Sequence, residues 1–107
     1  MGKTTQNNKK EQEAQNVHKD HRKRLRKDMK ACNFHPANSH NMLEFILTYS
    51  HSRKDVNPLA HALINRFGSF SNVMDAKISD LVKVKGVGEI TAMLIYSYKK
   101  VIEYYNE

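Results

Sequence analysis

The chain has 107 residues and a formal net charge of +7, with 39% hydrophobic residues. This length allows one small domain and a tail, and the excess of positive charge favours a polyanionic partner. The charge is unevenly placed. Residues 1–30 hold ten Lys or Arg against four Asp or Glu, a net +6, whereas residues 31–107 hold eight against seven, a net +1. The basicity therefore lies almost entirely in the N-terminal third.

Cysteine content and hydropathy exclude several classes of protein. Cys32 is the only cysteine, so an internal disulfide is excluded, and its neighbours Met29 and Phe34 predict a buried, unreactive thiol in a reducing compartment. No apolar run approaches the roughly 20 residues that a membrane span needs, and the polar start of the chain has no apolar region for secretion. We therefore expect a cytoplasmic protein that does not enter a membrane.

The N-terminal third divides into a polar tail and a basic helix. Residues 1–16 have almost no apolar side chains, which predicts a disordered tail before a domain at 17–107. A helical stripe then follows at Val17, His21, Leu25, Met29 and Cys32. Cations cover the rest of this helix: Lys19, Arg22, Lys23, Arg26, Lys27 and Lys30. They are open to two interpretations, contact with phosphates or a solvated helix surface.

Two further helices are predicted in the middle of the chain. Residues 33–38 form a loop, Ser39 is the expected N-cap, and residues 42–49 are apolar nearly all round, as in a helix inside a bundle. A polar connection over 50–56 precedes the second of these helices. Asn57 is its expected N-cap and Pro58 its first residue. Its core positions are Leu59, Ala60, Leu63, Ile64 and Phe67, and Gly68 is its expected end.

The C-terminal part is also predicted to be helical. Short helical turns are expected over 70–74 and 79–84, with Ser69 and Ser79 as caps. A last helix is expected from Gly88 to Tyr105. We expect one of its faces to hold Ile90, Leu94, Tyr98, Val101 and Tyr105. No segment has the pattern of a strand, so the predicted fold class is all-α, a bundle of five or six helices.

Residues 81–92 have the pattern of a helical hairpin. Gly86 and Gly88 allow a tight turn, and the second helix would begin with unpaired N–H groups that can hold a phosphate. This pattern resembles the helix-hairpin-helix, a module that grips the DNA backbone. Apolar residues on both sides would pack the two helices together: Leu81, Val84, Val87, Ala92 and Ile95. Lys83 and Lys85 add positive charge beside the turn, whereas Glu89 opposes an anion there.

Four motifs occur in the order seen in one bacterial family. They are Met42–Tyr49, Arg53–Ala60, Arg66–Phe70 and Val82–Glu89. Together with His21–Arg26 they closely resemble the N-terminal region of the RadC family, over roughly residues 18–104. The resemblance implies two helix-hairpin-helix units in tandem. The first, degenerate unit would be Met42–Phe67 with its hinge at Ser50–Val56, and the second Leu81–Ile95.

The chain departs from this family in one respect. Full-length RadC proteins continue into a zinc-hydrolase-like domain of the JAMM type with a His-x-His motif, which this sequence lacks. We therefore expect either a stand-alone helical module or a piece of a longer protein, without enzymatic activity and without a cofactor. The pairs His18/His21 and His35/His40 have no matching ligands at metal-site spacing, so no metal site is predicted. His51 and His61 are expected to be surface or packing residues.

The leading hypothesis is a DNA-binding module without sequence preference, with DNA repair as the process that the resemblance implies. The candidate phosphate contacts are Lys83, Lys85, Gly86, Val87 and Gly88 in the hairpin, Arg22, Lys23 and Arg26 in the basic helix, and Arg53 and Lys54 in the loop. The alternative is a protein-interaction or dimerisation module. Its apolar surface would be formed by Tyr96, Tyr98, Tyr104 and Tyr105.

Overall fold

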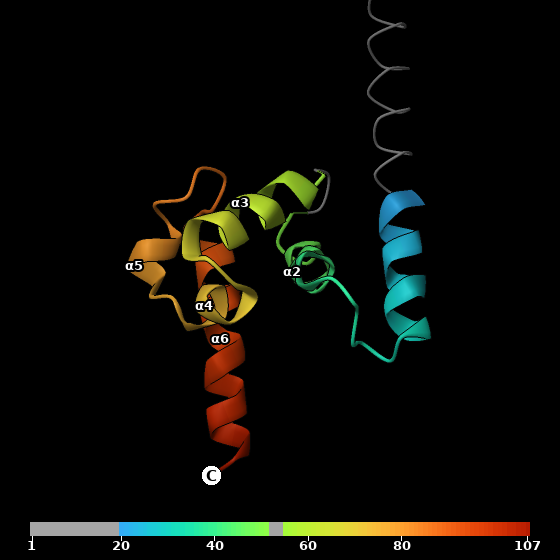
Figure 1. Cartoon of the computed structure of the whole chain (residues 1–107). Helices are drawn as coiled ribbons and strands as arrows, with labels where there is room; N and C mark the ends of the chain where they lie inside the picture. Colours follow the sequence, from blue (N-terminus) through green and yellow to red (C-terminus); the bar gives the residue numbers. More distant parts are fainter. Residues whose placement is uncertain (1–19, 52–54) are drawn as a thin grey trace, which may run out of the picture.

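The computed structural model of the chain describes residues 20–51 and 55–107, and over these residues all regular structure is helical (Figure 1). A helix over residues 20–31, here called the N-terminal helix, comes first. The others are α2 (Ser39–Leu47), α3 (Asn57–Phe67), α4 (Phe70–Asp75), α5 (Ile78–Leu81) and α6 (Glu89–Tyr105). The predicted all-α bundle is therefore confirmed. The tail expected over residues 1–16 lies outside the described residues.

The main core is built by all five helices from α2 to α6. Its buried side chains are Leu43, Leu47, Val56, Ala60, Leu63, Val73, Leu81, Val87, Ala92 and Ile95. Helix α2 packs against α3, α3 against α4, and both α4 and α5 against α6. The α2–α3 pair is the one that the RadC resemblance assigns to the first hairpin.

The N-terminal helix packs beside α2, outside this main core. Its Leu25 and Met29 are 7% and 1% exposed, so the predicted apolar stripe of this helix faces the protein and not the solvent. The helix ends where Asn33 and Phe34 adopt positive φ, and the Phe34 ring then meets the Phe45 ring of α2 edge-on at 5.8 Å. Cys32 is half-buried, and its thiol donates to the Met29 carbonyl over 3.4 Å. The predicted burial of this thiol is therefore only partial.

The boundary between α3 and α4 follows the sequence signals. Gly68 ends α3 with φ +96, a left-handed conformation that glycine adopts without a Cβ penalty. Ser69 caps α4, because its Oγ accepts the N–H of Asn72 over 3.1 Å. Both predictions are confirmed, since these signals act within one helical turn.

Three other predicted helix starts are displaced. Ser39 and Asn57 are the first residues of α2 and α3 and not their N-caps, and α5 begins at Ile78, so Ser79 lies inside it. At α3 the N-cap is Val56, which makes no side-chain cap bond, and the carboxylate of Asp55 accepts the N–H of Asn57, the first helical residue, over 3.0 Å.

In α6 the hairpin residues Ala92 and Ile95 are buried as predicted, but the predicted apolar face through Ile90, Val101 and Tyr105 is not the buried one. The residues of α6 that are buried are Thr91, Ala92 and Ile95, whereas Ile90, Val101 and Tyr105 are 74%, 63% and 87% exposed. Apolar side chains occur on more than one side of this helix. Its first half is covered by α4 and α5, and its second half projects beyond the other helices (Figure 1).

Candidate nucleic-acid interface

The second hairpin has the arrangement that its sequence predicts. Helix α5 ends at Leu81, a turn follows, and α6 starts at Glu89 with Gly88 as its N-cap. Leu81, Val87 and Ala92 are buried and hold the two arms together. The N–H of Val87 donates to the Val84 carbonyl over 3.0 Å, which closes the turn.

The two glycines of the turn have different roles. Gly86 has φ +95, and a Cβ added there would lie 3.4 Å from Cδ1 of Leu59. Gly88 has φ −86 in extended backbone, and an added Cβ would meet no heavy atom within 4 Å. Of the two glycines from which the sequence predicts a tight turn, Gly86 therefore needs glycine for its backbone conformation, whereas Gly88 does not.

The donors that the turn can offer to an anion come from its backbone. Among the described residues no acceptor is found for the N–H groups of Gly86 and Gly88. Gly88 is the N-cap of the 17-residue helix α6, and Gly86 lies in the turn, two residues before this N-terminus. Such a terminus carries the positive end of the helix dipole. Val87 does not fit its predicted role as a phosphate contact, because its N–H is already bonded to Val84 and its side chain is buried.

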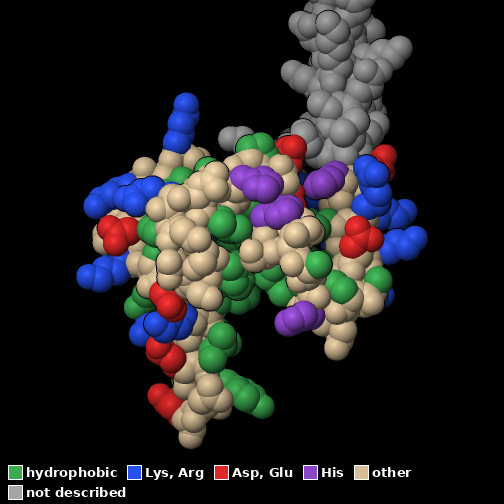
Figure 2. Space-filling model, in the orientation of Figure 1, with side chains coloured by type: hydrophobic (Ala, Val, Ile, Leu, Met, Phe, Trp, Pro, Cys, Tyr) green, Lys and Arg blue, Asp and Glu red, His purple; other side chains and the backbone are tan. Residues whose placement is uncertain are grey.

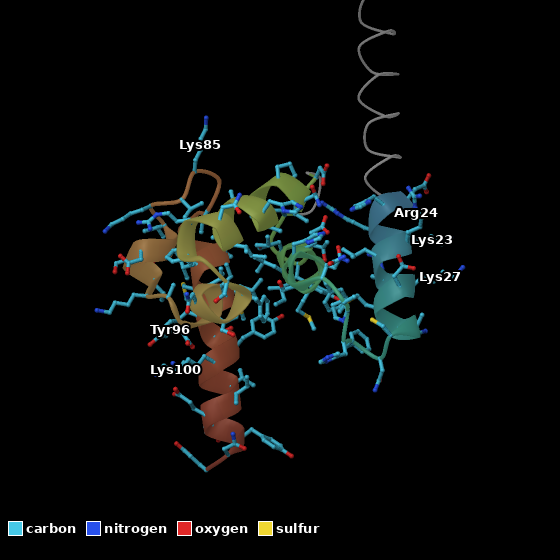
Figure 3. All side chains as sticks on the ribbon, in the orientation of Figure 1. Lys23, Arg24, Lys27, Lys85, Tyr96 and Lys100 are labelled. Atoms are coloured by element: carbon cyan, nitrogen blue, oxygen red, sulfur yellow. The ribbon has the colours of Figure 1, made fainter. Side chains whose placement is uncertain are left out.

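The charged side chains of the hairpin are unequal. Lys85 points away from the body of the protein (Figure 3), and it has no ion pair with any described residue. Lys83 forms an ion pair within the hairpin, because its Nζ lies 3.4 Å from Oδ1 of Asp80. Glu89 is exposed at the first residue of α6 and places one negative charge near the turn. Lys85 is therefore the main cation available here.

The N-terminal helix presents the second group of cations. Lys23 and Arg26 are exposed as predicted, and Lys23, Arg24 and Lys27 point away from the body in Figure 3. Figure 2 shows basic side chains over the hairpin on one side and over the N-terminal helix on the other, with histidines between them. Arg53 and Lys54, predicted as loop contacts, lie outside the described residues.

His51 connects these two regions, a role that the sequence did not indicate. Arg22 of the N-terminal helix donates from its guanidinium to the His51 carbonyl. The His51 ring lies with Nε2 3.2 Å from the Gly86 carbonyl and with Nδ1 3.0 Å from Oγ of Ser50. Because a carbonyl can only accept, Nε2 carries the proton. Arg22, predicted as a phosphate contact, is half-buried and ties the N-terminal helix to this loop.

A buried carboxylate holds the N-terminal helix from its other side. Glu44 of α2 is 2% exposed, and its Oε1 lies 3.4 Å from Nε2 of His21. With Asp55, these residues bring three possible metal-ligand atoms within 4.8 Å of one another. Both carboxylates already have structural partners, His21 for Glu44 and the N–H of Asn57 for Asp55. The sequence offered two histidine pairs, His18/His21 and His35/His40. Of these four residues, His18 lies outside the described residues.

The described helices include none that is both long and apolar enough to cross a membrane.

A family model for the helix-hairpin-helix motif matches residues 69–98, which include α4, α5, the turn and the first half of α6. The chain carries a helix-hairpin-helix motif. This motif is one that generally binds DNA, and the match covers the segment in which Gly86 and Lys85 form the exposed end of the hairpin.

Curated relatives extend this similarity. The chain is 42% identical over 71 residues to a UPF0758 protein of Ruegeria pomeroyi, covering 66% of this chain and 32% of the relative. It is 35% identical over 69 residues to a UPF0758 protein of Fusobacterium nucleatum, covering 64% and 30%, and 48% identical over 48 residues to one of Rhodobacter capsulatus, covering 45% and 22%.

These relatives are RadC-family proteins, so the resemblance seen in the sequence is confirmed for the matched part. The chain spans about a third of the length of the first two relatives and less of the third. No solved structure is significantly similar to the chain.

Proposed function

We propose that the chain is a DNA-binding module that contacts the phosphate backbone without reading base sequence. The observation that carries the proposal is the hairpin turn before helix α6, where the N–H groups of Gly86 and of the N-cap Gly88 have no acceptor among the described residues and Lys85 stands beside them. Backbone donors at a helix N-terminus, together with one cation, suit a phosphate. They make no contact with base edges, so they position the module without specifying a sequence.

The N-terminal helix supplies the second contact in this proposal. Lys23, Arg26 and their exposed neighbours can each neutralise a phosphate and release a counterion. Because residues 31–107 are almost neutral, most of the salt dependence of binding would come from this helix. Affinity should therefore fall by orders of magnitude between low and moderate salt.

The test is fluorescence anisotropy of labelled duplex and single-stranded DNA at two salt concentrations. Lys85→Glu should weaken binding several-fold for every sequence tested and lower the salt slope by about one, while stability stays nearly unchanged. Lys100→Glu is the matched control, since Lys100 lies on the far half of α6 from the turn (Figure 3). Equal effects of the two variants would contradict a phosphate site at the turn.

The proposed module binds and does not catalyse. A role in DNA repair rests on the RadC resemblance, and deletion of the gene should then sensitise its host to DNA damage. An unchanged survival curve would separate DNA binding from repair.

A further inference from the structure

A pocket of about 440 Å³ lies between the start of α3 and the hairpin turn. Its apolar lining comes from the first six residues of α3 and the residue before them: Val56, Pro58, Leu59 and Ala62. Lys85 and Gly86 of the turn line it as well, so the pocket adjoins the donors to which the proposed function assigns a phosphate. Its volume is within the range of about 300–1,000 Å³ that is usual for small-molecule sites.

Two polar side chains, those of His51 and Asp55, complete the lining of this pocket. The His51 ring is held through both nitrogens, with Nε2 3.2 Å from the Gly86 carbonyl and Nδ1 3.0 Å from Oγ of Ser50. Hydrogen bonds to ring nitrogens run in the plane of the ring, so these two leave both faces of the imidazole uncovered. Among the described residues no aromatic ring stacks on His51. The pocket therefore contains an aromatic surface whose orientation is fixed.

The chemistry of this lining favours a flat, uncharged ring. The carboxylate of Asp55 disfavours a second phosphate in the pocket, and the other walls are mostly apolar. Nucleobases in single-stranded nucleic acid stack on aromatic side chains, histidine included. One sugar connects a base to its phosphate, and the pocket begins at Gly86, where the phosphate is assigned. A nucleotide with its phosphate at the turn and its base in the pocket matches both features.

The pocket suits a base that is already unpaired. A protein that takes a base out of an intact duplex must offset the lost stacking and pairing, and it does so with hydrogen bonds to the edge of the base. Lys85 points outward (Figure 3), and the other side chains of the pocket that can form hydrogen bonds are those of His51 and Asp55. Both already have partners in the protein. The pocket therefore has little with which to extract a paired base.

We propose that this pocket binds an unpaired nucleobase, so that the module prefers DNA with an unpaired nucleotide to intact duplex DNA. The inference rests on the proposed function, because the phosphate of this nucleotide is the one assigned to the hairpin turn. Since the walls are mostly apolar and stacking uses the face of a base, the identity of the unpaired base should matter little.

The test compares labelled duplexes of one sequence by fluorescence anisotropy at low salt, one intact and one with a single unpaired adenine in the middle. The bulged duplex should bind about fivefold more tightly or better, as expected from the stacking of one base on an aromatic side chain. A third duplex carries an abasic site in the bulge and should lose this gain. If the abasic bulge binds as tightly as the adenine bulge, the protein responds to the bent backbone alone and the proposal is overturned.

Two variants test the pocket itself. Ala62→Leu narrows it at an exposed position of α3, and His51→Ala removes its aromatic surface. Each should bring the ratio of bulged to intact affinity down towards one. Asn65→Leu is the matched control and should keep the parent's ratio, because Asn65 is exposed on the same helix and does not line the pocket. A ratio that stays at the parent's value in both Ala62→Leu and His51→Ala overturns the proposal.

The same measurements separate this inference from the proposed function. If the chain binds the intact duplex and Lys85→Glu weakens that binding, but the bulge brings no gain, the pocket proposal alone fails. If the chain binds none of the three duplexes, the proposed function fails and the pocket proposal fails with it.

Discussion

The N-terminal helix and the second hairpin both present positive charge, but they are held in the protein by different means. The hairpin is part of the main core through side chains such as Leu81, Ala92 and Ile95, which are fully buried. The N-terminal helix buries only Leu25 and Met29 and otherwise relies on polar ties to α2 and to the loop at His51. The hairpin, held by the main core, thus provides backbone N–H groups in a fixed position. The N-terminal helix is more weakly anchored and provides most of the positive charge.

Met29→Ala should have the largest effect, because it weakens the anchoring of the N-terminal helix and leaves that of the hairpin unchanged. Met29 is 1% exposed, so its truncation should cost about 2–5 kcal/mol of the packing that holds the N-terminal helix. Hydrogen exchange should show the amides of residues 20–31 losing protection, while those of α5 and α6 keep theirs. Met93→Ala, at a half-exposed site, should change stability by less than about 0.5 kcal/mol. Equal loss of protection in both regions would show that they unfold as one unit.

Gly86→Val tests the hairpin in the same way. A β-branched residue at φ +95 should cost about 1–3 kcal/mol through backbone strain, since its Cβ would lie 3.4 Å from Leu59 Cδ1, close to ordinary contact. Gly88→Val is the matched control, since that position has open space and extended backbone. Thermal unfolding of both variants measures the difference. If Gly88→Val is as harmful as Gly86→Val, the positive φ at Gly86 is not what makes the turn depend on glycine.

His51→Ala should have the smallest effect, because it removes the ring's exposed hydrogen bond to Gly86 and its bond to the neighbouring Ser50, and leaves the carbonyl that accepts from Arg22. The expected loss is about 1 kcal/mol, visible as faster exchange of the amides around the turn. His61→Ala serves as the control for removal of an imidazole, because the His61 ring stacks on His40 with ring centroids 4.4 Å apart. An unchanged turn in His51→Ala would remove this residue from the account of how the two regions are linked.

The same comparison explains how much the sequence could predict. The turn at Gly86, the end of α3 at Gly68 and the cap at Ser69 depend on residues within one helical turn of each other, and these predictions hold. The buried face of α6 depends on which part of the helix α4 and α5 cover. That is not encoded in the spacing of α6 alone: Ala92 and Ile95, which the hairpin pattern predicted to pack, are buried, whereas the apolar face through Ile90 and Val101 is exposed.

The missed parts of the candidate site are all long-range. Arg22 meets His51 across 29 positions, His51 meets Gly86 across 35, and His21 meets Glu44 across 23. No local pattern pairs such residues. The one sign in the sequence of these long-range contacts was Glu44, a glutamate in an otherwise apolar segment, because a buried carboxylate requires a partner.

The most direct test of the central claim is an NMR titration of the ¹⁵N-labelled chain with a short DNA duplex at low salt. The account predicts the largest shifts at the amides of Gly86 and Gly88, with further shifts at the exposed positions of residues 20–31, and the same pattern for unrelated duplex sequences. Shifts confined to the N-terminal helix, with Gly86 and Gly88 unmoved, would contradict it, since the hairpin would then only pack two helices together.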